Sequence, residues 1–348
     1  MTNEENKVTI PERMLTVTLP PHIHEHENTA RTMGCVILPL LCLIALSTYY
    51  YGARVVVLTA ISVITCVASE WLYERLTMKK CTVGDLSAVV TGLLLACTLP
   101  PSLPIWMPVV GGVFAIVAVK QVFGGIGKNF MNPALAARAF MMLSWPSSFS
   151  TWPAVHTQLP LFRSSVDIIS SATPLASLKA GEAPAEDLLQ LFIGERGGSI
   201  GETAAVILIA GGLLLLVTRV ITWHIPTAYI GTVALVALIF PRVSYMPLGT
   251  YLLTEIMSGG VLLGAIYMAT DYATAPVHPV GKIIFGVGCG VLTMFMRYKG
   301  SGPESVCFAI LVMNCFTWLI DRATAPVVLR DRWAKIRAKL SRKGAKAQ

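Results

Sequence analysis

The chain has 348 residues, of which 54% are hydrophobic and 13% are charged, with a mean hydropathy of +0.66 and a net charge of +8. These values exclude an ordinary soluble protein, in which charged residues make up about a quarter of the chain. A bilayer core requires about 20 apolar residues per helix, so the sequence predicts a polytopic membrane protein.

Ten apolar segments follow one another along the chain. Several are short or interrupted by glycine and proline, which membrane helices tolerate where neighbouring helices satisfy the freed backbone groups. The segments are residues 34–51, 54–73, 86–98, 106–123 and 133–145, then 203–219, 224–241, 251–270, 281–296 and 305–320. We expect one five-helix repeat over residues 34–146 and a second over residues 203–321.

The two sets of five segments share the order of their motifs. Ala96-Cys-Thr-Leu-Pro-Pro, a glycine-rich span and a glycine-rich loop precede the fifth segment, and Ala269-Thr-Asp, Thr274-Ala-Pro, a glycine-rich span and Lys299-Gly-Ser-Gly-Pro precede the tenth. Because five is odd, two similarly folded halves must have opposite orientations across the membrane. The expected fold is all-α, with about ten transmembrane helices in two inverted five-helix repeats that contain short or broken helices.

Basic residues predict the orientation. The tail over residues 322–348 is strongly basic, and the positive-inside rule assigns it to the cytoplasm. With ten spans the N-terminal segment, residues 1–33, is also cytoplasmic, and residues 147–202 form an extracytoplasmic loop. No nucleic-acid motif accompanies the tail, so we expect it to contact anionic lipid or a partner subunit.

The remaining reactive residues give little signal. The eight cysteines lie mostly inside apolar segments without a Cys-x-x-Cys pair, so we interpret them as packing residues and predict no metal site. Soluble-enzyme motifs are absent, and no catalytic residue is predicted. Asp85, Glu70 and Glu255 lie at or within spans, where each could belong to an ion path.

The outer loop contains Ser170-Ser-Ala-Thr-Pro. Its ordinary interpretation is that Thr173 caps a helix whose first residue is Pro174. The alternative is that this accessible hydroxyl forms a phosphoester with a nucleotide.

Two further loops carry polar groups on the face opposite to Thr173. In the loop that begins at Gly124, glycines allow close backbone approach and Lys128, Asn129 and Asn132 supply donors, although the pattern is neither a Walker loop nor a dinucleotide fingerprint. The alternative for this loop is a structural connection between spans. Asp271 ends a span, where a carboxylate is usually a cap or an interfacial group.

These motifs resemble those of a known family, and they occur in that family's order within residues 39–321. The D subunit of the Rnf ion-translocating electron-transport complex, and the related B subunit of the sodium-translocating NADH:quinone reductase, have signatures similar to Gly124-Gly-Ile-Gly-Lys-Asn-Phe-Met-Asn-Pro-Ala, Ser171-Ala-Thr-Pro-Leu, Gly198-Ser-Ile-Gly-Glu-Thr and Met268-Ala-Thr-Asp. Met131 departs from the family, in which phenylalanine is more usual at this position.

The resemblance implies two flavins. One is FMN joined through its phosphate to Thr173 by a separate flavin transferase, in a motif that Ser170, Ser171 and Ala172 complete. The other is a non-covalent riboflavin near the cytoplasmic face. Its expected neighbours are Lys128, Asn129, Asn132, Asp271 and Thr274.

The resemblance also implies a function in the bacterial inner membrane. The chain is then the flavin-carrying subunit of a ferredoxin:NAD⁺ oxidoreductase complex that moves Na⁺ or H⁺, and it relays electrons between partner subunits without an NADH or ferredoxin site of its own. The alternatives are an inverted-repeat solute or ion transporter or channel without a redox cofactor, and a purely structural subunit. Arg138, one turn into the fifth segment, is expected to snorkel to lipid headgroups, with neutralisation of a reduced flavin as the alternative.

Overall fold

The computed structural model describes residues 28–78, 81–161, 173–243, 246–300 and 305–325. Within these ranges the regular structure is helical and contains no strand. The predicted all-α class is therefore confirmed for this part of the chain.

The first half begins with two long apolar helices, α1 (Thr29–Tyr51) and α2 (Arg54–Leu76). Shorter segments follow, namely η1 (Val83–Asp85), α3 (Ser87–Cys97), α4 (Trp106–Val113), its π-helical continuation η2 (Phe114–Gln121) and α5 (Pro133–Ser144). Helix α5 begins at proline because Asn132 caps the helix and proline fits the first helical position.

Short helical turns occupy the connection between the halves. They are η3 (Pro146–Phe149), α6 (Pro174–Ala180), α7 (Leu188–Ile193) and η4 (Ile200–Glu202). The second half contains α8 (Ala205–Val217), α9 (His224–Ile239), α10 (Leu248–Met257), α11 (Val261–Leu263), the π-helical η5 (Gly264–Met268), α12 (Pro279–Lys299) and α13 (Ser305–Thr324).

By length and composition, four of the described helices can cross a membrane alone: α1, α2, α12 and α13. Helix α10 and the α11–η5 segment qualify only together, and they are bent by 60°. Five shorter apolar helices are α3, α4 with η2, α5, α8 and α9. The chain is thus a multi-pass membrane protein in which each predicted apolar segment coincides with a helix or helix pair, and α1 begins earlier than predicted, at Thr29.

The bend between α10 and α11 has a local cause. Gly259 and Gly260 have φ values of 64° and 69°, a conformation that interrupts the helix and that glycine adopts without strain. The Arg297 guanidinium donates hydrogen bonds to the carbonyl oxygens of Glu255 (2.8 Å) and Ser258 (2.6 Å). The backbone groups freed at the break are therefore satisfied inside the protein.

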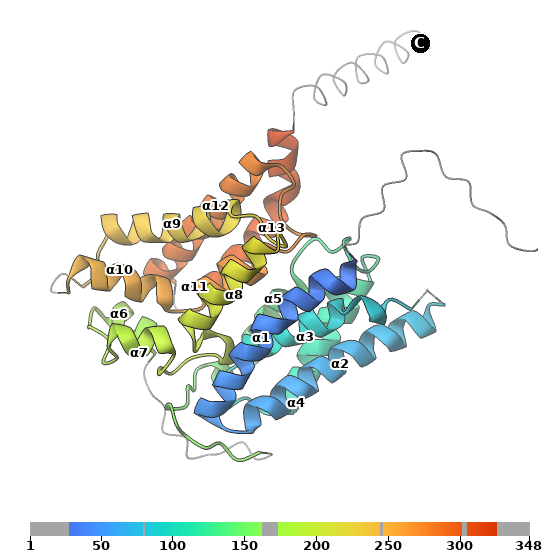
Figure 1. Ribbon diagram of the computed structural model, residues 1–348, viewed down its shortest axis with the longest axis horizontal. Coiled ribbons are helices and arrows are strands. Elements are labelled where there is room, and N and C mark those ends of the chain that lie inside the picture. Colours follow the sequence, from blue (N-terminus) through green and yellow to red (C-terminus); the bar gives the residue numbers. More distant parts are fainter. Residues whose placement is uncertain (1–27, 79–80, 162–172, 244–245, 301–304, 326–348) are drawn as a thin grey trace, which may run out of the picture.

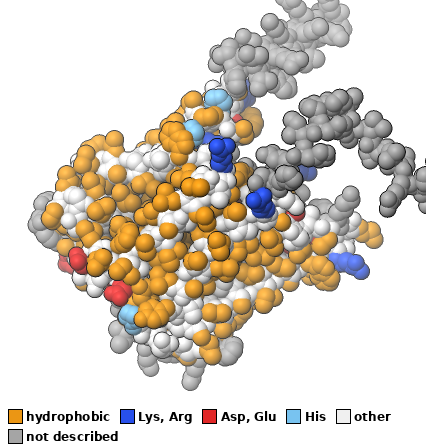
Figure 2. All heavy atoms as spheres, viewed as in Figure 1, with side chains coloured by type: hydrophobic (Ala, Val, Ile, Leu, Met, Phe, Trp, Pro, Cys, Tyr) orange, Lys and Arg blue, Asp and Glu red, His pale blue; other side chains and the backbone are white. Residues whose placement is uncertain are grey.

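The halves pack against each other through a few central helices. In Figure 1, α1 to α4 lie together on one side, α9, α10, α12 and α13 lie on the other, and α5, α8 and α11 lie between them. Contacts of α1 with α8, and of α5 with α13, join the halves. The face in Figure 2 is mainly hydrophobic, with Lys and Arg side chains toward its upper right and Asp and Glu side chains toward its lower left.

Helices α9 and α12 pack at backbone distance because α12 has glycines on the contact face. A Cβ on Gly286 would lie 2.9 Å from the Ile225 carbonyl oxygen, whereas a Cβ on Gly231 would have no heavy atom within 4 Å. We expect Gly286→Val to destabilise the protein by about 1–3 kcal/mol or more, as overpacking does, and Gly231→Val to leave stability nearly unchanged. Thermal unfolding in detergent measures both, and equal midpoints would contradict this packing.

Candidate functional site

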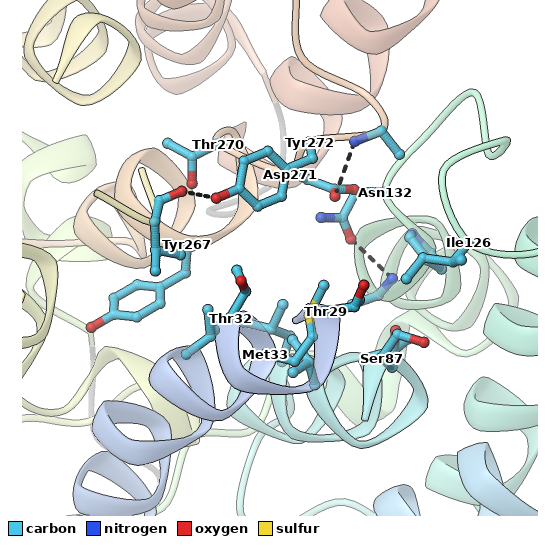
Figure 3. A pocket seen from close by; sticks show the side chains of 18 of the residues that line it. Thr29, Thr32, Met33, Ser87, Ile126, Asn132, Tyr267, Thr270, Asp271 and Tyr272 are labelled. Atoms are coloured by element: carbon cyan, nitrogen blue, oxygen red, sulfur yellow. Dashed lines mark hydrogen bonds between the residues drawn. The ribbon is translucent and has the colours of Figure 1, made fainter. Parts of the chain in front are cut away.

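A cavity of about 560 Å³ opens where the two halves meet. Its walls come from the start of α1, the start of α3, the loop before α5, the end of α8 and the loop after η5. Figure 3 shows Thr29, Thr32, Ser87, Asn132 and Asp271 arranged around it. The volume is that of a small-molecule site, and the lining is mainly apolar with a few polar groups.

The two asparagines of the loop before α5 both line this cavity. Asn132 is 3% exposed, and its Oδ1 accepts hydrogen bonds from the backbone N–H groups of Ala134 (3.0 Å) and Leu135 (3.3 Å). Its Nδ2 donates to the Met268 carbonyl oxygen (3.3 Å), which belongs to the second half. Asn129 donates from Nδ2 to the Met131 carbonyl oxygen (3.1 Å). Asn132 therefore caps α5 and also joins the two halves at the cavity wall.

Asp271 also lines the cavity, in the loop that follows η5. Its carboxylate accepts hydrogen bonds from the Ala273 backbone N–H (3.4 Å) and the Thr274 hydroxyl (3.3 Å). Burial raises the pKa of Asp271 above its ordinary value, and these hydrogen bonds and Lys120 oppose that rise. Thr274 is 2% exposed, and the hydrogen bond from its hydroxyl fixes the position of the Asp271 carboxylate.

The other predicted neighbour, Lys128, is exposed. Its side chain lies beside Gly124, where a Cβ would come within 2.7 Å of Lys128 Cδ. Asn129, Asn132 and Asp271 are thus brought to one cavity, Thr274 supports it, and Lys128 lies outside the set of residues that line it.

Lys120, one of the residues that line the cavity, belongs to a buried ion pair. Lys120, in η2, is 3% exposed, and its Nζ lies 2.7 Å from Glu70 Oε1 and 2.7 Å from the Ser87 hydroxyl. Gln121 Nε2 donates to the same Glu70 oxygen (2.9 Å). Lys120 was not among the site residues predicted from the sequence. The available signal was a lysine directly after an apolar run, with an acid in an earlier span, since charges within spans pair with each other.

Thr173 lies in a separate, small recess. Its Oγ1 accepts a hydrogen bond from the Ala176 backbone N–H (3.3 Å), so its predicted role as a helix N-cap is confirmed. Ser170, Ser171 and Ala172 lie outside the described residues. The recess has a volume of about 20 Å³, and it is lined by Trp152, Thr173, Pro174, Leu175, Arg196, Gly197, Glu202 and Gly259.

Arg196 is a wall residue that the sequence analysis did not find. It is 3% exposed. Burial lowers the pKa of its guanidinium, and the Glu202 carboxylate opposes that shift. A lone arginine between two helices of a long loop gives no sequence signal, since most such residues are exposed.

A second recess of about 20 Å³ shares the lining residues Glu202 and Gly259 with the Thr173 recess. Arg138 also lines it and is 4% exposed. The expectation that Arg138 snorkels to lipid headgroups is therefore wrong. Helix α5 directs this side chain into the protein, near Glu202.

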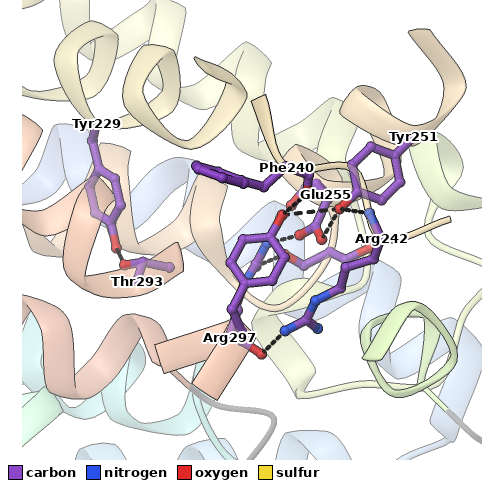
Figure 4. A network of polar contacts seen from close by, with 9 residues as sticks. Tyr229, Phe240, Arg242, Tyr251, Glu255, Thr293 and Arg297 are labelled. Atoms are coloured by element: carbon purple, nitrogen blue, oxygen red, sulfur yellow. Dashed lines mark hydrogen bonds and ion pairs between the residues drawn. The ribbon is translucent and has the colours of Figure 1, made fainter. Parts of the chain in front are cut away.

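A polar network that includes the Arg297–Glu255 ion pair connects α10 to α12. Arg297 Nη1 lies 2.5 Å from Glu255 Oε2, and both side chains are buried. The Tyr251 hydroxyl donates to Glu255 (3.2 Å), and the Arg242 guanidinium donates to the Arg297 carbonyl oxygen (2.6 Å). Figure 4 shows these groups converging at the bend. Glu255, a candidate for an ion path, is thus held in an ion pair.

Comparison with known proteins gives one consistent family. A model described as the NQR2, RnfD, RnfE family matches residues 16–330. The D subunit of the Na⁺-translocating ferredoxin:NAD⁺ oxidoreductase complex of Acetobacterium woodii is 46% identical over 89% of this chain and 93% of the relative. The D subunit of the proton-translocating complex of Clostridium ljungdahlii is 37% identical over 93% and 98%. The D subunit of the ion-translocating oxidoreductase complex of Stutzerimonas stutzeri is 36% identical over 85% and 90%.

Proposed function

The chain belongs to the NQR2, RnfD, RnfE family, and we propose that it is the flavin-carrying membrane subunit of an ion-translocating ferredoxin:NAD⁺ oxidoreductase complex. The names of its relatives support membership in such a complex. The subunit relays electrons between its partner subunits, while the NADH and ferredoxin sites belong to those partners. The observation that carries the proposal is the cavity between the halves, because it gathers polar motifs from two distant parts of the chain.

The proposed fold consists of ten spans in two inverted five-helix repeats. A matching pair of contacts supports it. Lys120, at the end of the fourth helix of the first half, donates to the Ser87 hydroxyl where α3 begins (2.7 Å). Arg297, near the end of α12, donates to the Ser258 carbonyl oxygen at the break between α10 and α11 (2.6 Å). In each half, a cation near the end of the fourth segment binds a serine of the third segment, at the start of α3 in the first half and at the break in the second half, as expected of two related repeats.

In the proposed orientation both chain ends and the large cavity face the cytoplasm, and Thr173 faces the other side. The excess of basic residues after Asp321 supports it. The basic tail then contacts anionic lipid or a partner protein of the complex.

The residues of the large cavity fit a flavin without a phosphate. Among the described lining residues the charged ones are Lys120 and Asp271, and Lys120 is already paired with Glu70. Among these lining residues a phosphate would meet the Asp271 carboxylate and no unpaired cation, which favours riboflavin over FMN. Asn129, Asn132 and the hydroxyls of α1 and α3 supply hydrogen bonds to a polar ring edge. A bound flavin would supply one- and two-electron chemistry, and the chain orients it and excludes water.

Thr173 is the proposed ester site for FMN, installed by a flavin transferase. Its partial exposure at the start of α6 supports access by another enzyme. The neighbouring Arg196 supplies a cation, which a phosphate ester requires for favourable burial.

The cavity proposal is tested by filling the cavity from α1. Thr32→Trp places an indole in the space that the flavin needs, so we expect heat-released, non-covalent flavin to fall at least about tenfold, which corresponds to about 1.4 kcal/mol of lost binding. Leu38→Trp is the matched control, because Leu38 lies on the same helix and is 58% exposed. Chromatography of flavins from the purified complexes measures both. Unchanged releasable flavin in Thr32→Trp would reject the cavity as the site, and a wild-type complex without any flavin would favour a transporter.

A further inference from the structure

The recess at Thr173 is too small for a three-ring flavin. Its volume of about 20 Å³ exceeds only slightly the space that one water molecule requires. It can therefore take one or two oxygen atoms of an attached group, while the rest of that group lies outside. A phosphate presents oxygen atoms at the point of attachment.

Arg196 is built into the wall of this recess. The Tyr51 hydroxyl donates a hydrogen bond to the Arg196 carbonyl oxygen (2.8 Å), and Tyr51 is fully buried at the end of α1. Close by, the Ile200 backbone N–H donates to the Leu99 carbonyl oxygen (3.0 Å). The loop that presents Arg196 is thus fixed to both α1 and the end of α3.

The guanidinium of Arg196 has unused hydrogen-bonding capacity. Among the described residues it donates one hydrogen bond, from Nη2 to the Glu202 carbonyl oxygen, whereas a guanidinium carries five N–H donors. Arg196 is nevertheless buried, with 3% of its surface exposed. A buried cation with free donors beside a modifiable hydroxyl is the arrangement that an anion completes.

The charges around the recess favour one added negative charge. Glu202 lines both recesses, with Arg196 in one and Arg138 in the other, and its negative charge acts on both arginines. Glu186 also acts on Arg196, but it is partly exposed and weaker in effect than Glu202. Glu202 therefore offsets the charge of Arg196 only in part. A phosphodiester carries one negative charge at neutral pH, and guanidinium binds phosphate oxygens in a bidentate manner.

We propose that Arg196 binds the phosphate of the flavin esterified to Thr173 through phosphate oxygen atoms that occupy this recess, with the ring system outside. This inference rests on the proposed function, because it requires flavin attachment. It assigns to Arg196 a binding role that is separate from forming the ester. If Arg196 binds the phosphate, the folded protein should become more stable when flavin is attached, and this gain should depend on Arg196.

The experiment compares each variant with and without attached flavin, by expression in hosts that contain or lack the transferase. In the wild-type chain, attachment is expected to raise the unfolding temperature by roughly 2–4 °C. Arg196→Gln should lose this increment, and Arg196→Lys should keep part of it because it retains the charge without the bidentate geometry. Lys179→Gln is the control, since it removes an exposed cation from the helix that Thr173 caps. It should keep the full increment.

Phosphorus NMR of the flavin-bearing proteins gives a second readout, in which Arg196→Gln should shift the phosphodiester resonance and Lys179→Gln should not. An unchanged increment and resonance in Arg196→Gln would overturn the inference while leaving attachment intact. If Arg196→Gln does not accumulate, Arg196→Lys decides, and wild-type behaviour in both readouts would overturn the inference. A wild-type chain that carries no flavin after maturation would instead reject attachment itself.

Discussion

Thr173→Ala is expected to remove all covalently attached flavin, because alanine has no hydroxyl with which to form the ester. Denatured wild-type protein from a transferase-competent host should fluoresce in a gel, and Thr173→Ala should give no signal above background. In membranes, ferredoxin-dependent NAD⁺ reduction should fall to background as well, since an electron relay that lacks one carrier is interrupted.

Alanine also removes the N-cap of α6, so the variant alone does not separate the two roles of Thr173. Loss of a cap costs about 1 kcal/mol. Thr173→Asn keeps a good cap but has no hydroxyl, and it should match the wild-type protein in assembly while lacking flavin. Fluorescence that persists in Thr173→Asn would place the flavin elsewhere. A dark but fully active Thr173→Asn complex would indicate that the chain has only a structural role.

Local motifs made part of the site predictable. The Asn-Pro step at Asn132 and the Thr-Pro step at Thr173 each begin a helix, and capping chemistry depends on neighbours within three residues. The asparagine loop and the Asp271 loop were expected on one face from the count of spans, and both line the same cavity. Such features depend on the local sequence or on the number of membrane spans, so they can be inferred without knowledge of tertiary contacts.

The other walls could not be inferred, because distant segments supply them. Thr29 and Thr32 precede the first predicted span, and nothing in their local sequence indicates that α1 extends to the cavity. Arg138 was expected at the lipid surface, but its direction depends on how α5 packs between the halves. Arg196 reaches Thr173 only through contacts of its loop with α1 and α3.

The Lys120–Glu70 pair was only partly predictable. Both charged residues can be seen in the sequence, but their pairing depends on tertiary contacts. Both side chains are buried, the distance is 2.7 Å, and Glu70 Oε2 has no hydrogen-bond partner among the described residues. A buried pair contributes little net stability, yet removing one partner leaves an uncompensated charge. The two single variants and the double variant should therefore differ strongly in stability.

Lys120→Met is expected to destabilise the protein by about 3–5 kcal/mol, because it leaves Glu70 charged and buried. The double variant Lys120→Met with Glu70→Gln should recover most of that loss, since Gln121 can still donate to the neutral amide oxygen. Lys299→Met, which removes an exposed lysine at the end of α12, should have little effect. Unfolding in detergent measures these three variants and the single variant Glu70→Gln, and the double-variant cycle then gives the coupling energy. If the stability losses of the two single variants added in the double variant, Lys120 and Glu70 would have no coupling energy. Apolar packing alone would then stabilise this part of the cavity wall.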